Sequence, residues 1–412
     1  MALCDEKVTI RVAELPSSGK VKISASMILP WGNSIKYESF ALFTADSSGT
    51  LDLSKQKPDS GSYDFPDSMG LIDSMRRVSG KLGDIVKNMT VSASIFIDIV
   101  AECGQDKASV RLKRLIKLPE VKNQAIADEF VGELFYTENS DNQTIIFIGG
   151  SGSGLAINAP LAAALASHGF NVLSVSYFGE KGLPDKLSEI PLEYFEKVFA
   201  WLSKNPITRG KEIQLFGMSK GAELSLLLAS RYPFITKVAA MAPHAYCFQG
   251  LAFKAVSSWT CQGESVPFIQ LKTRWLITNM ISSMVKNKPF GFTHTYKKGL
   301  EAAKNKEDAR IKVENAKADL LLFTTKQNNM WNSYDGCVQI MDTLRKNNYK
   351  QKYDLIVYED AGEPYYVPYI IPVSESTAKM APRLVLSMGG TLQGNSCARV
   401  DSWKKTIDFF KN

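Results

Sequence analysis

Cysteine is scarce and scattered in this sequence, and its spacing excludes several kinds of protein. None of the six cysteines forms a C-x-x-C pair, which argues against a zinc site and against a small scaffold held by disulfides. Widely separated thiols fit a reducing compartment. The six residues are Cys4, Cys103, Cys247, Cys261, Cys337 and Cys397.

Long hydrophobic runs are absent as well. No apolar stretch reaches the ~18 residues that a transmembrane helix needs, so no membrane span is expected. Residues 1–7 lack the apolar core of a secretory signal, and residues 409–412 do not form a peroxisomal signal. We therefore expect a cytoplasmic protein.

Blocks of like charge are missing too, although the net charge is +7. Lysine and arginine are spread along the chain, whereas nucleic-acid binding would need a clustered basic stripe. We predict no nucleic-acid partner. A mildly basic surface instead suits an anionic substrate such as a CoA ester. The oligomeric state stays open.

The length of 412 residues suggests two domains, and the first 120 residues read as β-structure. Apolar and polar residues alternate over 8–12, 21–27 and 91–100, with turn residues between these stretches. Several short alternating strands predict a β-sandwich. No histidine or other catalytic cluster falls in this part, which we interpret as an accessory module.

From about residue 125 the pattern changes to strands that alternate with helices. This rhythm predicts an α/β domain with a doubly wound, mostly parallel sheet covered on both faces, whose sites gather at the carboxyl ends of the strands. Residues 247–312 interrupt this alternation of strands and helices. We interpret them as a cap inserted over the site, with surface loop mixed with helix as the alternative. The predicted strands are 144–148, 171–177, 213–216, 237–241, 318–323 and 353–358, and the predicted helices include 159–166, 192–202 and 222–229.

The central motif is G-x-S-x-G at residues 217–221, between a predicted strand and a predicted helix. In this context the motif is typical of a nucleophile elbow, which makes Ser219 the candidate nucleophile. The backbone N–H of Lys220 would then be the first donor to an oxyanion. The glycine-rich loop 149–154 lacks the lysine of a phosphate-binding loop. Its Ser151 and Gly152 are candidates for the second donor, and a plain glycine turn is the alternative.

With these motifs, the sequence resembles the family of acyl-CoA thioesterases and bile acid-CoA:amino acid N-acyltransferases. The resemblance implies an immunoglobulin-like sandwich over residues 1–120 and an α/β-hydrolase domain over residues 125–412. It also implies an acyl-CoA or related thioester substrate, with no cofactor and no metal. The residues that carry it are DSMGL at 67–71, GSGSGL at 150–155, LEYFE at 192–196, GMSKGAEL at 217–224, GESVP at 263–267 and RVDSWK at 399–404.

The resemblance further implies a catalytic triad, and here the sequence departs from the family. Ser219 stands at the nucleophile position, but Asn328 occupies the place of the aspartate and Glu363 the place of the histidine. Losing such partners typically lowers turnover by ~10⁴-fold or more. Glu363 could itself act on Ser219, but a carboxylate with a pKa near ~4 is a weak general base unless burial raises it.

Histidine could compensate at only three positions. His168 is predicted at the surface and His294 in the inserted segment, where we interpret it as structural. His244 follows a strand at the carboxyl edge of the sheet, as an alternative base or a polar lining residue. Two functions therefore remain open: an acyl-CoA thioester hydrolase or acyltransferase of weakened activity, and a protein that binds acyl-CoA without turning it over.

Overall fold

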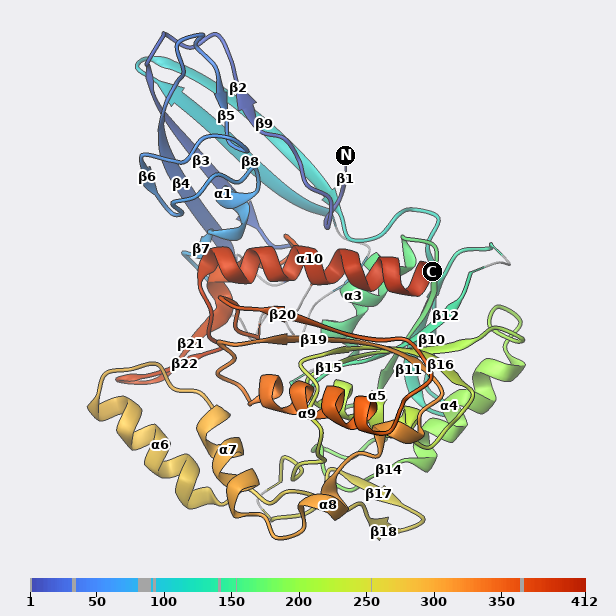
Figure 1. Cartoon of the computed structure of the whole chain (residues 1–412). Coiled ribbons are helices and arrows are strands. Elements are labelled where there is room, and N and C mark those ends of the chain that lie inside the picture. The colour runs from blue at the N-terminus through green and yellow to red at the C-terminus, as the bar shows by residue number, and fades with distance from the viewer. Residues whose placement is uncertain are drawn as a thin grey trace.

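The computed structural model describes residues 2–31, 35–80, 90–91, 94–139, 142–152, 154–252, 254–363 and 367–412. Two β-sheets dominate it. Figure 1 shows the N-terminal sheet on one side of the long helix α10 (Leu392–Lys411) and the second sheet on the other.

The N-terminal sheet is antiparallel apart from the short strand β1, and one of its faces is buried. Along β3, Val21, Ile23 and Met27 alternate with exposed or half-buried side chains, as the sequence pattern predicts. The strand order is β1 (Ala2–Leu3), β9 (Asp106–Leu115), β8 (Ser94–Cys103), β3 (Lys20–Ile28), β4 (Lys36–Thr44), β6 (Ser60–Gly61), and β7 (Arg76–Arg77) also pairs with β4.

The buried face of this sheet packs against the chain that connects β4 to β7. Leu51, Leu53 and Leu71 belong to the same hydrophobic core as the inward side chains of β3 and β4. In this connection lie β5 (Leu51–Asp52), which pairs with β2 (Arg11–Val12), and the helical turn α1 (Gly70–Asp73). Of the strand predicted over 8–12 only Arg11–Val12 forms, and residues 92 and 93 of the one predicted over 91–100 lie outside the described part.

The second sheet confirms the predicted α/β architecture, because its strands are parallel except at one edge. Two antiparallel edge strands, β10 and β11, were not predicted from the sequence. The strand order is β10 (Lys122–Ile126), β11 (Val131–Tyr136), β13 (Asn171–Ser176), β12 (Thr144–Ile148), β15 (Ile213–Met218), β16 (Ile235–Met241), β19 (Asp319–Thr325), β20 (Tyr353–Tyr358).

Helices cover both faces of this sheet, so its central strands are apolar on both sides. Ile145 and Phe147 of β12 share a core with α3 and α10, whereas Ile146 and Ile148 share a core with α4, α5 and α9. Figure 1 shows α3 and α10 above the sheet and the other three helices below it. Their bounds are α3 (Leu155–Ala166), α4 (Glu193–Lys204), α5 (Lys220–Ala229) and α9 (Ser333–Lys346).

The long connection from β16 to β19 contains helices that lie beside a hairpin from the end of the chain. The backbone N–H of Phe290 donates to the carbonyl of Val385 (2.7 Å), and the N–H of Ser387 donates to the carbonyl of Phe290 (2.9 Å). The connection comprises β17 (Trp259–Cys261), which pairs with β14 (Ile190–Pro191), then β18 (Glu264–Ser265), α6 (Thr273–Val285), α7 (Thr293–Ala302), α8 (Lys306–Ala309) and the 3₁₀ turn η1 (Val313–Asn315). The 3₁₀ turn η2 (Val373–Ser376) precedes the hairpin of β21 (Thr377–Ala381) and β22 (Leu384–Ser387).

Polar contacts join the N-terminal sheet to the α/β part. Oδ2 of Asp5 accepts a hydrogen bond from Nε1 of Trp403 (2.7 Å) and lies 2.5 Å from Nε2 of His168. Arg77 forms an ion pair with Glu375 (3.0 Å). No helix in the described part of the chain has the length and apolarity to cross a membrane.

Candidate active site

Ser219 lies at the sharp turn between β15 and α5, with φ 52° and ψ −117°. A positive φ is uncommon for a residue other than glycine, and such strained conformations concentrate at functional sites. The turn is held by the backbone N–H of Ser219, which donates to the carbonyl of Met241 on the neighbouring strand (2.8 Å). The geometry therefore matches the strand, turn and helix that the G-x-S-x-G motif predicts.

The two glycines of the motif are required by close packing. A Cβ atom on Gly221 would lie 2.1 Å from the carbonyl oxygen of Ile148, and one on Gly217 would lie 2.4 Å from Oγ of Ser225. Neither position tolerates a side chain unless backbone atoms move. Gly221 thus lets the end of β12 approach the turn that presents Ser219, and Gly217 lets α5 pack closely on β15.

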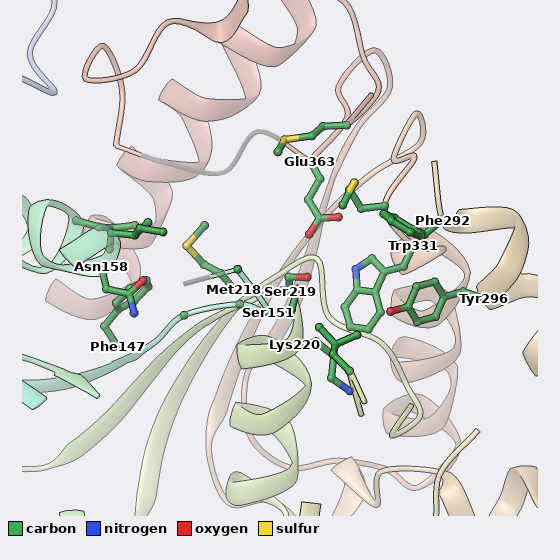
Figure 2. A pocket seen from close by; sticks show the side chains of 18 residues that line it. Phe147, Ser151, Asn158, Met218, Ser219, Lys220, Phe292, Tyr296, Trp331 and Glu363 are labelled. Atoms are coloured by element: carbon green, nitrogen blue, oxygen red, sulfur yellow. The ribbon is translucent and has the colours of Figure 1, made fainter. Parts of the chain in front are cut away.

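Ser219 opens into a mostly apolar pocket of about 480 Å³ (Figure 2). Aliphatic and aromatic side chains form most of the wall, with a few polar groups near Ser219, which is the usual composition of a site for a small organic ligand. The lining residues are Phe147, Gly149, Gly150, Ser151, Gly152, Ile157, Asn158, Leu161, Met218, Ser219, Lys220, Leu251, Phe292, Tyr296, Met330, Trp331, Glu363 and Met388.

Glu363 brings a carboxyl group to Ser219 from the segment after β20. Burial raises the pKa of this carboxyl to about 7, and interactions with the side chains of Ser219 and Asn328 oppose that rise because they favour the carboxylate. Its Oε2 atom is buried and has no hydrogen-bond partner among the described residues. A glutamate with a pKa near 7 can accept a proton at neutral pH far better than an ordinary one.

Asn328 is fixed by its own loop. Its Oδ1 accepts hydrogen bonds from the backbone N–H groups of Met330 (2.7 Å) and Trp331 (3.2 Å). Its Nδ2 donates to Oγ of Ser333 (3.3 Å), which in turn lies 2.9 Å from Oγ1 of Thr324. These contacts leave the amide no freedom to turn, so Asn328 presents its donor edge in one direction. The structure thus brings Ser219, Asn328 and Glu363 together.

The predicted oxyanion residues also line the pocket. Lys220 is the first residue of α5, where the N-terminal N–H groups carry partial positive charge. Ser151 and Gly152 belong to the glycine-rich loop, which also lines the pocket. Gly150 of this loop approaches Ser219 so closely that an added Cβ would lie 3.2 Å from the serine Cβ. Ser153 of the same loop lies outside the described residues, as does Pro364, the residue after Glu363.

The side chain of Lys220 takes no part in the pocket chemistry. Its ammonium group donates to Oε1 of Glu223 (2.6 Å) and to the carbonyl of Phe248 (3.2 Å), and both charged side chains are buried. The indole N–H of Trp259 donates to the same Oε1 (2.8 Å). This arrangement could not be read from the motif, since it needs partners that lie about 30 residues further along the chain.

His244 does not reach Ser219. It is fully buried, packs edge-on against Phe248 with ring centroids 4.7 Å apart, and is not among the described residues that line the pocket. Burial lowers the pKa of His244 to about 3, helped by the nearby charge of Lys220, so its imidazole is neutral. The position of His244 therefore contradicts the prediction that this residue is an alternative base. His168 contacts Asp5, and His294 is exposed on α7.

Trp331 is the pocket residue whose role the sequence did not indicate. Its side chain is 2% exposed, and its indole N–H is buried without a partner among the described residues. Figure 2 shows the nitrogen edge of the ring directed toward Ser219 and Glu363. Among the buried side-chain atoms of the described lining residues, Nε1 of Trp331 is therefore an unused donor and Oε2 of Glu363 an unused acceptor.

Comparison with known proteins places this geometry in a family. The family model for the C-terminal part of BAAT and acyl-CoA thioester hydrolases matches residues 190–412, and the model for their N-terminal region matches residues 5–128. Acyl-coenzyme A amino acid N-acyltransferase 1 of Mus musculus is 28% identical over 420 residues, which span 100% of this chain and 95% of the relative. Acyl-coenzyme A thioesterase 1 of Homo sapiens is 24% identical over 412 residues, spanning 98% and 93%.

Among solved structures, an alpha/beta hydrolase enzyme from a deep-sea metagenome library is similar with a TM-score of 0.40 at 12% identity, over 71% of this chain and 99% of that one. Together the two family models match most of the chain, including Ser219, Trp331 and Glu363 of the pocket. The chain belongs to the BAAT/acyl-CoA thioester hydrolase family.

Proposed function

We propose that the protein cleaves acyl-CoA thioesters through Ser219 and passes the acyl group to water or to an amine. Relatives in the family are named as acyl-CoA thioesterases and as an acyl-CoA amino acid N-acyltransferase. The apolar pocket of about 480 Å³ supports an acyl chain as the part of the substrate that is buried.

The observation that carries the proposal is the carboxyl group of Glu363 beside the hydroxyl of Ser219. The carboxylate takes the proton of Ser219 while Oγ attacks the thioester carbonyl, and the C–S bond then breaks. The CoA thiolate leaves with the proton from Glu363, and an acyl-serine ester remains. A base with a pKa near 7 suits both proton transfers at neutral pH.

Charge on the carbonyl oxygen needs donors that are already in place. The backbone N–H groups of Lys220 and of the loop at Ser151 and Gly152 are proposed to supply them, because both segments line the pocket together with Ser219. Asn328 is proposed to orient Glu363 and to favour its carboxylate form, because the amide is locked by Met330, Trp331 and Ser333.

The second half of the reaction has its own group of residues. A water that enters the acyl-enzyme can accept a hydrogen bond from Nε1 of Trp331 and donate one to Oε2 of Glu363, both of which are buried without a partner among the described residues. An amine would donate a hydrogen bond to Oε2 of Glu363 and keep its single lone pair for the attack. Glu363 then takes a proton from this acceptor as it attacks the ester carbonyl, and the proton passes to Oγ of Ser219. One carboxylate would thus serve both steps.

We also propose the finer division of the chain: an immunoglobulin-like sandwich over 1–120 as an accessory module, an α/β-hydrolase domain over 125–412, and a cap over about 247–312. The antiparallel sheet with one buried face supports the first, and Phe292 and Tyr296 in the pocket wall support the cap. A cytoplasmic location remains part of the proposal.

A fluorophosphonate probe tests the central claim, because it labels a serine only when a base activates the hydroxyl. We expect labelling of the full chain and thiol release from acyl-CoA, both abolished by Ser219→Ala and strongly reduced by Glu363→Gln. Binding of acyl-CoA with neither labelling nor turnover would overturn the proposal in favour of a protein that only binds the thioester.

A further inference from the structure

Helix α6 exposes an apolar face to solvent. Ile277, Ile281, Met284 and Val285 are 50%, 55%, 36% and 80% exposed, respectively. Their spacing of four, three and one residues places them on one side of the helix, away from the buried Ser283. Contiguous apolar surface of this kind marks an interaction site more often than chance exposure does.

A second exposed apolar group lies beside this helix. Met380 is 61% and Val385 is 37% exposed on the hairpin of β21 and β22, which is hydrogen-bonded to the chain just after α6 through Phe290. Figure 1 shows α6 and this hairpin next to each other at one corner of the molecule, away from the N-terminal sheet. Together they form a surface that we call the apolar corner: Ile277, Ile281, Met284, Val285, Met380 and Val385.

The charged residues within the two segments that carry the apolar corner have one sign. Residues 265–300 and residues 376–400 contain no aspartate or glutamate. Lys297 and Lys298, on α7, are paired with Asp335 and Glu301, but no carboxylate in the described part of the chain pairs with the cations of the corner itself. These exposed cations are Lys272, Arg274, Lys286, Lys288, Lys379 and Arg383.

The order of these groups along α6 is informative. Lys272 and Arg274 precede the apolar face and lie over the ring of Trp275, at 5.6 and 5.5 Å from its centroid, and Lys286 and Lys288 follow the face. Aliphatic side chains between cations, with a tryptophan at the boundary, are typical of a helix that lies in the interface of a membrane. The cations can contact lipid phosphates while the aliphatic side chains enter the acyl layer.

We propose that the apolar corner docks on the surface of an anionic phospholipid membrane, with the axis of α6 parallel to the plane of the bilayer. A neutral apolar partner would leave six unpaired cations without a counter-charge, whereas an anionic lipid surface satisfies both features of the corner. The corner also adjoins the pocket: Phe292, which follows α6, and Met388, which follows β22, are part of its wall. Docking would therefore bring the pocket close to molecules that partition into membranes through an acyl chain.

The test is sedimentation of the full chain with vesicles of phosphatidylcholine containing about 30 mol% phosphatidylserine, compared with phosphatidylcholine alone. We expect binding to the anionic vesicles that weakens in high salt. The double variant Lys286→Gln/Lys288→Gln should bind more weakly by about fivefold for each charge removed. The triple variant Ile277→Ser/Ile281→Ser/Val285→Ser should lose at least about tenfold in affinity.

Two matched controls keep the result interpretable. Val110→Ser removes an equally exposed aliphatic side chain (52%) from the N-terminal sheet and should leave vesicle binding unchanged. Ser219→Ala should also bind vesicles like the wild type, so that this inference and the proposed chemistry can fail separately. The thermal midpoint of each variant shows that it is folded.

Three outcomes would overturn the inference. The first is wild-type chain that sediments no better with anionic vesicles than with neutral ones. The second is an equal loss of binding in Val110→Ser and the triple variant. The third is a wild-type chain that does not bind vesicles but self-associates through α6. In that case the oligomeric state would change in the triple variant and not in the Val110→Ser control. That result would assign the corner to a second copy of the chain.

Discussion

The ammonium group of Lys220 lies 2.6 Å from Oε1 of Glu223, and the two side chains are 3% and 0% exposed. The pair is completed by the indole N–H of Trp259 and the backbone of Phe248, so each charge is compensated inside the protein. Removing one partner of a buried ion pair leaves an uncompensated charge in a medium that solvates it poorly.

Lys220→Met should therefore lower the free energy of unfolding by about 3–5 kcal/mol. Urea denaturation measures the change. The matched control is Lys298→Met, which breaks a pair with the same i, i+3 spacing but with side chains 44% and 62% exposed, and should cost less than about 1 kcal/mol. Equal losses in the two variants would show that burial does not determine how much an ion pair contributes to the free energy of unfolding.

The activity of the wild type should rise with pH. Glu363 must be deprotonated to accept the proton of Ser219, and its pKa is raised to about 7 by burial, so the rate of probe labelling should increase through a midpoint near pH 7. Labelling by the probe against pH, with Glu363→Gln as the comparison, checks this. A wild-type profile that is flat over the same range would exclude Glu363 as the base.

The same carboxyl should make the folded state less stable as the pH rises. The unfolded chain releases the Glu363 proton near 4.5 and the folded chain near 7, so the folded state holds one more proton between these values. The contribution of Glu363 to the free energy of unfolding is therefore fully present below about pH 4.5 and is lost as the pH rises through about 7. Glu363→Gln removes the effect and should gain up to about 3 kcal/mol over the wild type at pH 8.

Unfolding at pH 8 and at pH 5 measures this gain. The difference between variant and wild type isolates Glu363, because Asp73, whose pKa burial raises to about 6, is present in both proteins. A gain that is the same at both pH values would contradict the assignment.

Rebuilding the family triad should affect the rate of acyl-CoA cleavage in opposite directions for single and double changes. Asn328→Asp alone places a second carboxylate beside Glu363, which raises the pKa of that glutamate further and slows the reaction at pH 7. Glu363→His alone leaves an imidazole without an acid to fix its tautomer. The double variant supplies both and should exceed the product of the single effects by at least about tenfold. Thiol release from acyl-CoA measures it, with Ser219→Ala as the blank.

Trp331→Phe should separate the two halves of the reaction. The change removes the unpartnered indole N–H and keeps a smaller aromatic ring in the wall. We expect probe labelling of Ser219 within about twofold of the wild type and a deacylation rate lowered by about tenfold, the range of one lost hydrogen bond to a reacting group. A burst of thiol release followed by slow turnover would report this. Labelling that falls as much as turnover would place Trp331 in the first step instead.

Local sequence patterns predicted those parts of the fold that depend on local chemistry. The turn at Ser219 follows from glycines that no other residue can replace, and β12 follows from an unbroken apolar run over residues 144–148. The edge strand β10 was missed because most of its side chains are exposed, which leaves no apolar period to detect. The approach of Asn328 and Glu363 to Ser219 follows the register that the family resemblance implies.

Side-chain environments could not be predicted in the same way. The raised pKa of Glu363 and the lowered pKa of His244 both come from burial by residues far away in the sequence. The unpartnered N–H of Trp331 likewise depends on how α7 and the loop after β19 pack, which no single stretch of residues records. A histidine at a strand end therefore looked like a candidate base, although the fold places its ring in a dry aromatic core.

The hydrogen bond between Asp5 and Trp403 joins residues separated by 398 positions in the chain. A ribosome makes a chain in one direction, so Asp5 must wait for almost all of the α/β part to be synthesised before its partner exists. The N-terminal sheet can form its strands early, but it cannot be anchored to α10 until then. A chain arrested before residue 403 can already place Asp5 against His168 and Arg77 against Glu375, but it lacks the hydrogen bond that ties Asp5 to α10.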